Sequence, residues 1–389
     1  MKTTTEANIV GPVVLVVDAI DEAGAIEIRQ RLLDAIAEEF PNLPDSIKVI
    51  ITSRDEQDIR TSLHVCSDEI CIEKSEKTAE DIASYIQHRF ARIRRTSSLP
   101  ESWPTSDKLQ ALYIGSERLF IWASVACSFV ENGRDHSRRL AQILDLTRNQ
   151  KGSTPSPLSK LYSLYNHILE NAFPVQDGPP VDFQYVVGSI IALETPLTRI
   201  ELDSLLGFSG DPDNDGVVMP NGHVIDLLSS AVVVNRLRPI LRKTTDVNRG
   251  EDSPVRLLHP SLYDFLTTHA EGNFRIDVIQ QHQMLAIRCL HIMNNELKFD
   301  ICEIGDSSLP NKEISEISQY MSPGLHYSCL SLVYHIVKVS EPNPVLISAL
   351  RKFICEHILH WIEAMSLLNA VSKAEDCLKA LDGWMKVSS

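Results

Sequence analysis

Two short apolar runs stand near the start of the chain, Val13–Val17 and Ile47–Ile51. Continuous runs rich in β-branched residues are typical of strands buried on both faces of a parallel sheet. Between them, apolar residues three or four positions apart predict a helix over 25–40. Strand, helix and strand make a βαβ unit, which leaves sheet edges without partners. A further short extended segment is predicted at 64–73.

Helical spacing of apolar residues dominates the next part of the chain. A helix is predicted from Thr78, with the threonine as its N-cap. Three more helices are predicted over 105–115, 118–131 and 135–147. The sequence Gln150–Pro157, rich in glycine, serine and proline, then predicts a linker.

Helices and strands are both predicted between residues 155 and 272. The predicted helices are 158–172, 183–193, 199–206 and 223–229, and the predicted strands are 231–234 and 255–258. Three helices followed by a β-hairpin are typical of a winged-helix domain. From residue 280 onwards the apolar spacing is helical again.

These patterns predict a mainly α fold with a partial α/β parallel sheet at the N-terminus, followed by helical and winged-helix domains. The predicted domains are 1–75 (the C-terminal part of an α/β domain), 76–150 (small helical), 155–272 (winged-helix-like) and 275–389 (helical).

Polar residues follow both apolar strands. Asp18, Asp21 and Glu22 come directly after the first strand, and Thr52-Ser53-Arg54 comes directly after the second. Because the carboxyl ends of parallel strands meet at one edge of a sheet, we expect these side chains to lie together. Acidic side chains can hold a metal ion and polarise a water molecule, and an arginine can form an ion pair with a phosphate group. The pattern therefore predicts a phosphate-and-magnesium site.

Composition narrows the class of protein. The net charge of −15 over 389 residues argues against a nucleic-acid partner, because affinity for nucleic acid depends on neutralising phosphates. The eight cysteines show no C-x-x-C spacing, which favours reduced thiols. The N-terminus lacks the apolar core of a signal peptide, and the longest apolar run, Leu119–Val130, is too short to cross a membrane. We expect a cytoplasmic protein without a membrane partner.

The stretches VVLVVDAIDEA and IKVIITSRDEQDI resemble the Walker B and sensor 1 segments of NACHT-type NTPases, which belong to the STAND class of signalling ATPases. The similarity is greatest to the large fungal NACHT family. It continues at WPTSDKLQALYIGSERLFIWASVACSFV, LSKLYSLYNHIL, PLTRIELDSLLGF and LLHPSLYDFL, so it covers residues 12 to about 270 well and the remainder loosely.

The resemblance implies roles for particular residues. Asp18 would act through a magnesium ion, Glu22 would orient water, and Asp21 would serve either role or neither. Arg54 would sense phosphate. His259, in the segment LLHPSLYDFL, would contact the diphosphate of a bound nucleotide. We therefore expect His259 to lie nearer Arg54 and Asp18 than any other histidine does.

The family's P-loop, G-x-x-x-x-G-K-[ST], is missing, since no Gly-Lys pair occurs in the chain. The family binds Mg-ATP or Mg-GTP, but we expect this chain to bind neither tightly and to be inactive as an enzyme alone. The resemblance then implies an N-terminally truncated fragment of a nucleotide-regulated signalling switch, with protein partners or self-association. Two alternatives remain: a non-enzymatic helical interaction scaffold that has lost nucleotide binding, or a truncated gene model of an intact NTPase.

A winged helix also raises DNA binding as a function. Winged helices often read duplexes with a basic recognition helix. The helices predicted at 199–206 and 223–229 carry acids, with Arg199 as their one fixed cation. The sequence therefore favours a packing role for this domain in a switch.

Overall fold

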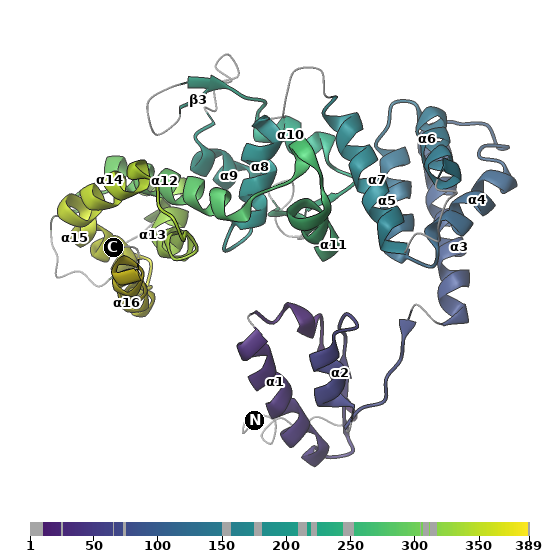
Figure 1. The fold of residues 1–389 in the computed structure, drawn as a ribbon, viewed down its shortest axis with the longest axis horizontal. Coiled ribbons are helices and arrows are strands. Elements are labelled where there is room, and N and C mark those ends of the chain that lie inside the picture. The colour runs from purple at the N-terminus through teal and green to yellow at the C-terminus, as the bar shows by residue number, and fades with distance from the viewer. Residues whose placement is uncertain are drawn as a thin grey trace. The chain divides into compact units, whose positions relative to one another are not determined.

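The computed structural model describes residues 11–24, 26–64, 66–72, 75–149, 157–174, 181–208, 216–218, 224–243, 253–303, 305, 311 and 317–387. The chain folds into two compact units, Met1–Thr78 and Ala79–Ser389 (Figure 1). The fold is mainly helical with a small parallel sheet in the first unit, as the apolar patterns predict. The finer division of the second unit into three domains stays a prediction.

The first unit is built on a pair of parallel strands. β1 (Val13–Val17) pairs with β2 (Ile47–Ile51) in a register that places Val13 opposite Ile47 and Val17 opposite Ile51. Helix α1 (Ile26–Glu39) connects the strands, and α2 (Gln57–Leu63) follows the second and packs on α1. The predicted strand–helix–strand order is confirmed. Short 3₁₀ turns at Ile20–Glu22 and Phe40–Asn42 flank α1.

The two strands are not buried on both faces, so that prediction is wrong. Val14 is 55% exposed, Val16 is 59% exposed and Ile50 is 53% exposed. Among the described residues of this unit, the buried apolar core consists of Ile20, Leu33, Ile36, Ile59 and Leu63. Successive side chains of a strand point to opposite faces, and Val17 and Ile51 pack against the core while Val14, Val16 and Ile50 lie on the other face.

The extended segment predicted at 64–73 forms no strand among its described residues, because α2 ends immediately before it. Thr78 is not an N-cap either. Helix α3 (Glu76–Thr96) begins before it, and the Thr78 hydroxyl donates a 2.6 Å hydrogen bond to the carbonyl of Ile72.

The second unit begins with a bundle formed by α3 and the helices that follow. These are α4 (Ser106–Ser116), α5 (Phe120–Glu131), α6 (His136–Asn149) and α7 (Pro157–Ala172), close to the predicted ranges. The linker predicted at Gln150–Pro157 lies outside the described residues except for Pro157, the first residue of α7. Helix α5 is buried on nearly every side, and α4, α6 and α7 contact it.

Helices and short antiparallel ribbons follow. They are α8 (Val181–Ala192), α9 (Arg199–Leu206), β3 (Gly216–Val218), β4 (Val224–Asp226), α10 (Ser230–Arg236), β5 (Leu241–Lys243), β6 (Val255–Leu257) and α11 (Pro260–Asp264). β3 pairs with β4, and β5 pairs with β6.

Two predicted elements in this region are wrong. The strand predicted at 231–234 is part of helix α10, and the partner of β6 is instead β5. A helix is predicted at 223–229, but the described residues of this range include strand β4. Val233 and Val234 are buried while Val232 is 37% exposed, so packing of one helical face overrides the strand preference of a valine run. The winged-helix assignment itself stays a prediction.

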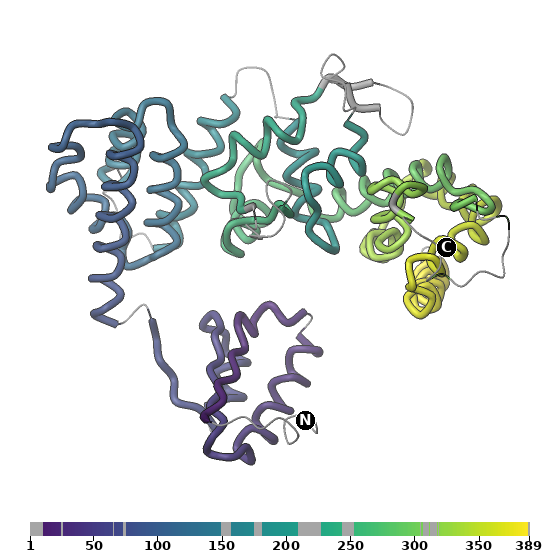
Figure 2. Tube along the Cα trace, turned by 180° about the vertical axis from the view of Figure 1, so that it is seen from behind, coloured from purple at the N-terminus to yellow at the C-terminus, as the bar shows by residue number. Residues whose placement is uncertain are grey.

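The C-terminal part of the second unit is a cluster of helices. They are α12 (Val278–Glu296), α13 (Pro323–Ile336), α14 (Pro344–Lys352), α15 (Ile358–Leu367) and α16 (Val371–Val387). Figure 2 shows them gathered around the C-terminus, with α12 and α13 packed together. In the described parts of the chain, no helix is both long and apolar enough to cross a membrane.

Candidate functional site

The carboxyl ends of β1 and β2 are joined by Asp18 and Thr52, the first residue after each strand. The Thr52 hydroxyl donates to Oδ1 of Asp18 at 2.5 Å and accepts from the backbone N–H of Ala19 at 2.8 Å. Ala19 has a left-handed backbone (φ 53°, ψ 53°), which turns the chain sharply out of the strand. Its neighbour Ile20 then donates from its backbone to the carbonyl of Thr52 at 3.0 Å.

Asp21 and Arg54 form a second link across the same edge. Oδ1 of Asp21 accepts from the backbone N–H of Arg54 at 3.1 Å, and Oδ2 accepts from Nε of Arg54 at 2.8 Å. The Asp21 side chain is only 4% exposed, whereas that of Arg54 is 47% exposed. Both carboxylate oxygens of Asp21 are therefore engaged by one residue, and this pairing suits a structural role better than water activation.

Arg29 of α1 connects the site to α2. Its Nη1 donates to the backbone carbonyl of Asp21 at 2.9 Å, and its Nε donates to Oδ2 of Asp58 at 2.9 Å. Sequence reasoning did not single out Arg29. The available signal was its place among otherwise apolar positions of the α1 stripe, but spacing alone cannot show which distant carbonyl a side chain reaches.

Glu22 is exposed and makes no hydrogen bond or ion pair with a described side chain. The structure thus brings Asp18, Asp21, Glu22 and Arg54 to one edge, as predicted, and adds Thr52 as their organiser. Their catalytic and phosphate-sensing roles stay predictions.

The residues at this edge allow a simple test of a magnesium site. Mg²⁺ is usually held by one or two carboxylates together with waters and substrate phosphates. Asp18 is exposed and oriented by Thr52, so it fits as a single carboxylate ligand, whereas Asp21 does not fit because Arg54 occupies both its oxygens. No cluster of three acidic, histidine or cysteine ligands occurs among the described residues. Asp18 could hold the ion only with help from a phosphate.

His259 lies in the second unit, where it caps α11. Its Nδ1 accepts from the backbone N–H of Ser261 at 3.1 Å and lies 2.8 Å from the Ser261 hydroxyl. That hydroxyl is in turn 3.0 Å from the Tyr165 hydroxyl of α7. The local role of His259 is therefore to start α11. Its predicted closeness to Arg54 and Asp18 stays a prediction, because they belong to the first unit.

Replacing Thr52 with valine should destabilise the first unit by about 1–2 kcal/mol, because the Asp18 carboxylate and the Ala19 N–H each lose a partner. Urea denaturation, monitored with a spectroscopic probe in the first unit, would measure the loss of stability. Thr52→Ser keeps the hydroxyl and is the matched control. Equal stability of the valine and serine variants would show that the hydroxyl does not organise this edge.

Comparison with curated proteins found a distant similarity to a fungal protein. The chain is 20% identical over 393 aligned residues to the vegetative incompatibility protein HET-E-1 of Podospora anserina, with 95% of this chain covered. The chain spans about a quarter (26%) of the length of that relative. No protein-family model matches the chain, and no solved structure matches it.

Proposed function

We propose that this chain is part of a NACHT-type STAND signalling switch that acts in a self/non-self response like vegetative incompatibility. The observation that carries the proposal is the strand edge, where Asp18 is held by Thr52 and Arg54 is held by Asp21. The similarity to HET-E-1 along nearly the whole chain supports the same class. Protein partners or self-association would transmit the state of the switch.

The Asp21–Arg54 ion pair suggests how such a switch would respond. The Arg54 side chain is half exposed and forms an ion pair with the nearly buried carboxylate of Asp21. A nucleotide phosphate at this edge would compete with Asp21 for the guanidinium, because arginine binds phosphate and carboxylate in the same forked geometry. Binding would then loosen the link between the two strand ends, which is the kind of ligand-dependent bias that a two-state switch requires.

The gene sequence upstream of the first codon tests the proposal. An in-frame G-x-x-x-x-G-K-[ST] segment would supply the missing phosphate loop, and the extended protein should then bind Mg-ATP or Mg-GTP. Changing Asp18 and Glu22 to alanine in that protein should abolish hydrolysis. An extended protein that folds but ignores both nucleotides would favour the alternative, a helical interaction scaffold without nucleotide binding.

The chain by itself should neither bind ATP tightly nor hydrolyse it. A P-loop supplies most phosphate contacts through backbone N–H groups and a lysine, and without it Asp18 and Glu22 repel a polyanion. Calorimetric titration with Mg-ATP should show no binding tighter than about millimolar that depends on Asp18 and Glu22 of the strand edge. Micromolar binding that disappears in an Asp18→Ala, Glu22→Ala variant would contradict this expectation.

A further inference from the structure

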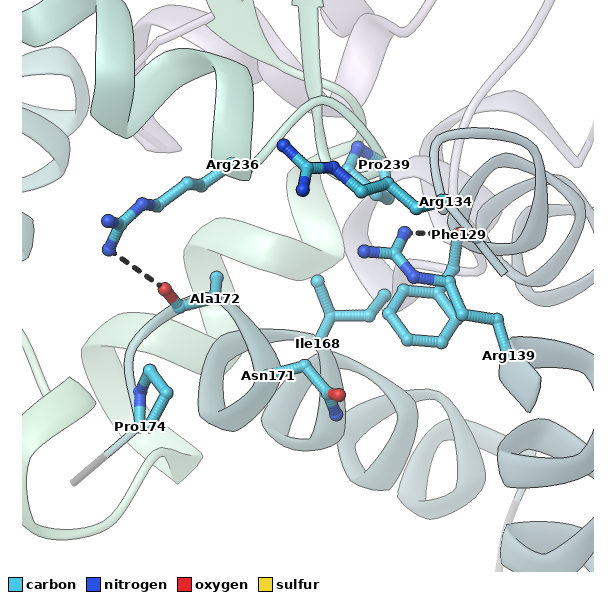
Figure 3. A pocket seen from close by; sticks show the side chains of 9 residues that line it. All are labelled: Phe129, Arg134, Arg139, Ile168, Asn171, Ala172, Pro174, Arg236 and Pro239. Atoms are coloured by element: carbon cyan, nitrogen blue, oxygen red, sulfur yellow. Dashed lines mark hydrogen bonds between the residues drawn. The ribbon is translucent and has the colours of Figure 1, made fainter. Parts of the chain in front are cut away.

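The second unit contains a cavity of about 510 Å³ that the sequence patterns do not indicate (Figure 3). Its walls come from segments far apart in the chain: the end of α5, the turn into α6, α6 itself, α7, and the residues around the end of α10. Phe129 and Ile168 are buried side chains of its lining. The volume lies within the range of small-molecule sites.

Three arginines line this cavity, Arg134, Arg139 and Arg236, and none of the described residues that line it is acidic. None of the three forms an ion pair with a described residue. Figure 3 shows Arg236 on one side of the space over Ile168, with Arg134 and Arg139 on the other. Such a gathering of cations is unexpected in a chain with a net charge of −15.

Two of these arginines are held in place by neutral groups. Arg139 lies over the ring of Phe129, 4.4 Å from its centroid, and Nη1 donates to the Phe129 carbonyl at 2.6 Å. Arg236 donates from Nη1 to the carbonyl of Ala172 at 3.2 Å. A ring face and carbonyl dipoles orient a guanidinium without neutralising it. The positive charges therefore remain available to a ligand.

We propose that this pocket binds a small molecule that carries two or more phosphate groups, with Arg134, Arg139 and Arg236 as the phosphate-binding residues. Arginine matches phosphate through paired N–H donors, and three guanidinium groups around one cavity suit several charges rather than one. A nucleic-acid backbone is a poorer occupant, since an extended polyanion would meet the negative charge of the rest of the chain. This proposal does not rest on the strand edge of the first unit.

Binding would join segments that are otherwise connected only through packing. A ligand that contacts both Arg134 after α5 and Arg236 at the end of α10 would connect residues about a hundred positions apart. It would also relieve the repulsion among the three cations. We therefore expect the ligand to raise the unfolding temperature of the second unit.

The test is calorimetric titration of the full chain with inorganic tripolyphosphate at moderate and at low salt. We expect saturable binding of one molecule per chain, weakened roughly tenfold or more in an Arg134→Gln, Arg236→Gln variant. Both of these side chains are exposed, so the variant should fold. Circular dichroism melting would verify that it does.

A matched control removes the same charge from neighbouring positions. Arg138 and Arg238 are exposed, stand beside the pocket arginines in the chain, and do not line the cavity. The Arg138→Gln, Arg238→Gln variant should bind tripolyphosphate like the unmodified chain. Equal weakening in both variants, or no saturable binding to the unmodified chain, would overturn the proposal. Tighter binding of single-stranded DNA than of tripolyphosphate at the same arginines would overturn it too.

The phosphates could belong to a free metabolite or to a lipid headgroup. Vesicles of phosphatidylcholine with and without a phosphoinositide bisphosphate distinguish the two sources. Sedimentation with the bisphosphate vesicles that is lost in the Arg134→Gln, Arg236→Gln variant supports a headgroup. Binding of tripolyphosphate without sedimentation supports a free molecule.

Discussion

Lowering the pH from 7 to 4.5 should reduce the free energy of unfolding of the second unit by several kcal/mol through two histidines, His282 and His335. They are 5% and 0% exposed, and their Nδ1 atoms lie 2.9 Å apart between α12 and α13. The hydroxyl of Tyr327 lies 2.9 Å from Nε2 of His335. One proton can bridge the two Nδ1 atoms, but a second would break that hydrogen bond.

Burial is the main cause of the pKa changes. Burial, together with the nearby charge of Lys338, lowers the pKa of His282 to about 4. Burial also lowers the pKa of His335 to about 3, with smaller effects from His282 and Lys338. In the unfolded chain both histidines titrate near 6.5. Because the folded pKa values are the lower ones, stability is complete above about pH 6.5 and decreases as the pH falls towards 4.

Urea denaturation at a series of pH values measures this effect. A His282→Asn, His335→Gln variant cannot take up these protons, so its stability should decline much less between pH 7 and 4.5, even if it is lower at pH 7. His326→Gln is the matched control, because His326 is exposed on the same helix as His335. Parallel pH profiles for the unmodified chain and the double variant would contradict the prediction.

The backbone amides of β1 and β2 should exchange with deuterium at least about 100-fold faster than those of α12 and α13. In its described part the first unit has a core of five buried apolar residues, and β1 exposes Val14 and Val16. A two-stranded sheet with so little apolar burial gains little free energy from folding. Helices α12 and α13 instead share the large core that extends from α3 to α16.

Hydrogen exchange followed by mass spectrometry of peptides would compare the two units in one sample. Leu33→Ala removes a fully buried side chain of the small core and should abolish protection of β1 and β2 while leaving α12 and α13 unchanged. Leu32→Ala is the matched control, because Leu32 is 40% exposed. Slow exchange in the strands of the unmodified chain would mean that something beyond this core protects them.

The amino-acid sequence alone determined those elements whose apolar periodicity agrees with the capping or turn residues at their ends. Helix α9 lies where its apolar spacing predicts, and Thr198 and Glu201 cap it reciprocally: the Thr198 side chain accepts from Glu201 N–H, and the Glu201 carboxylate accepts from Thr198 N–H. The ends of β1 and β2 were predictable for a similar reason. Parallel strands bring their carboxyl ends together, so Asp18 and Arg54 share an edge.

Only the tertiary structure decided the features that depend on distant partners. The valine run of α10 is helical because burial of one face outweighs the strand preference of valine. His282 and His335 are 53 residues apart, and the pocket arginines come from two distant segments. Spacing along the chain reports which face of one element is apolar. It does not report which other element covers that face, and these contacts set the charge, burial and pairing of each side chain.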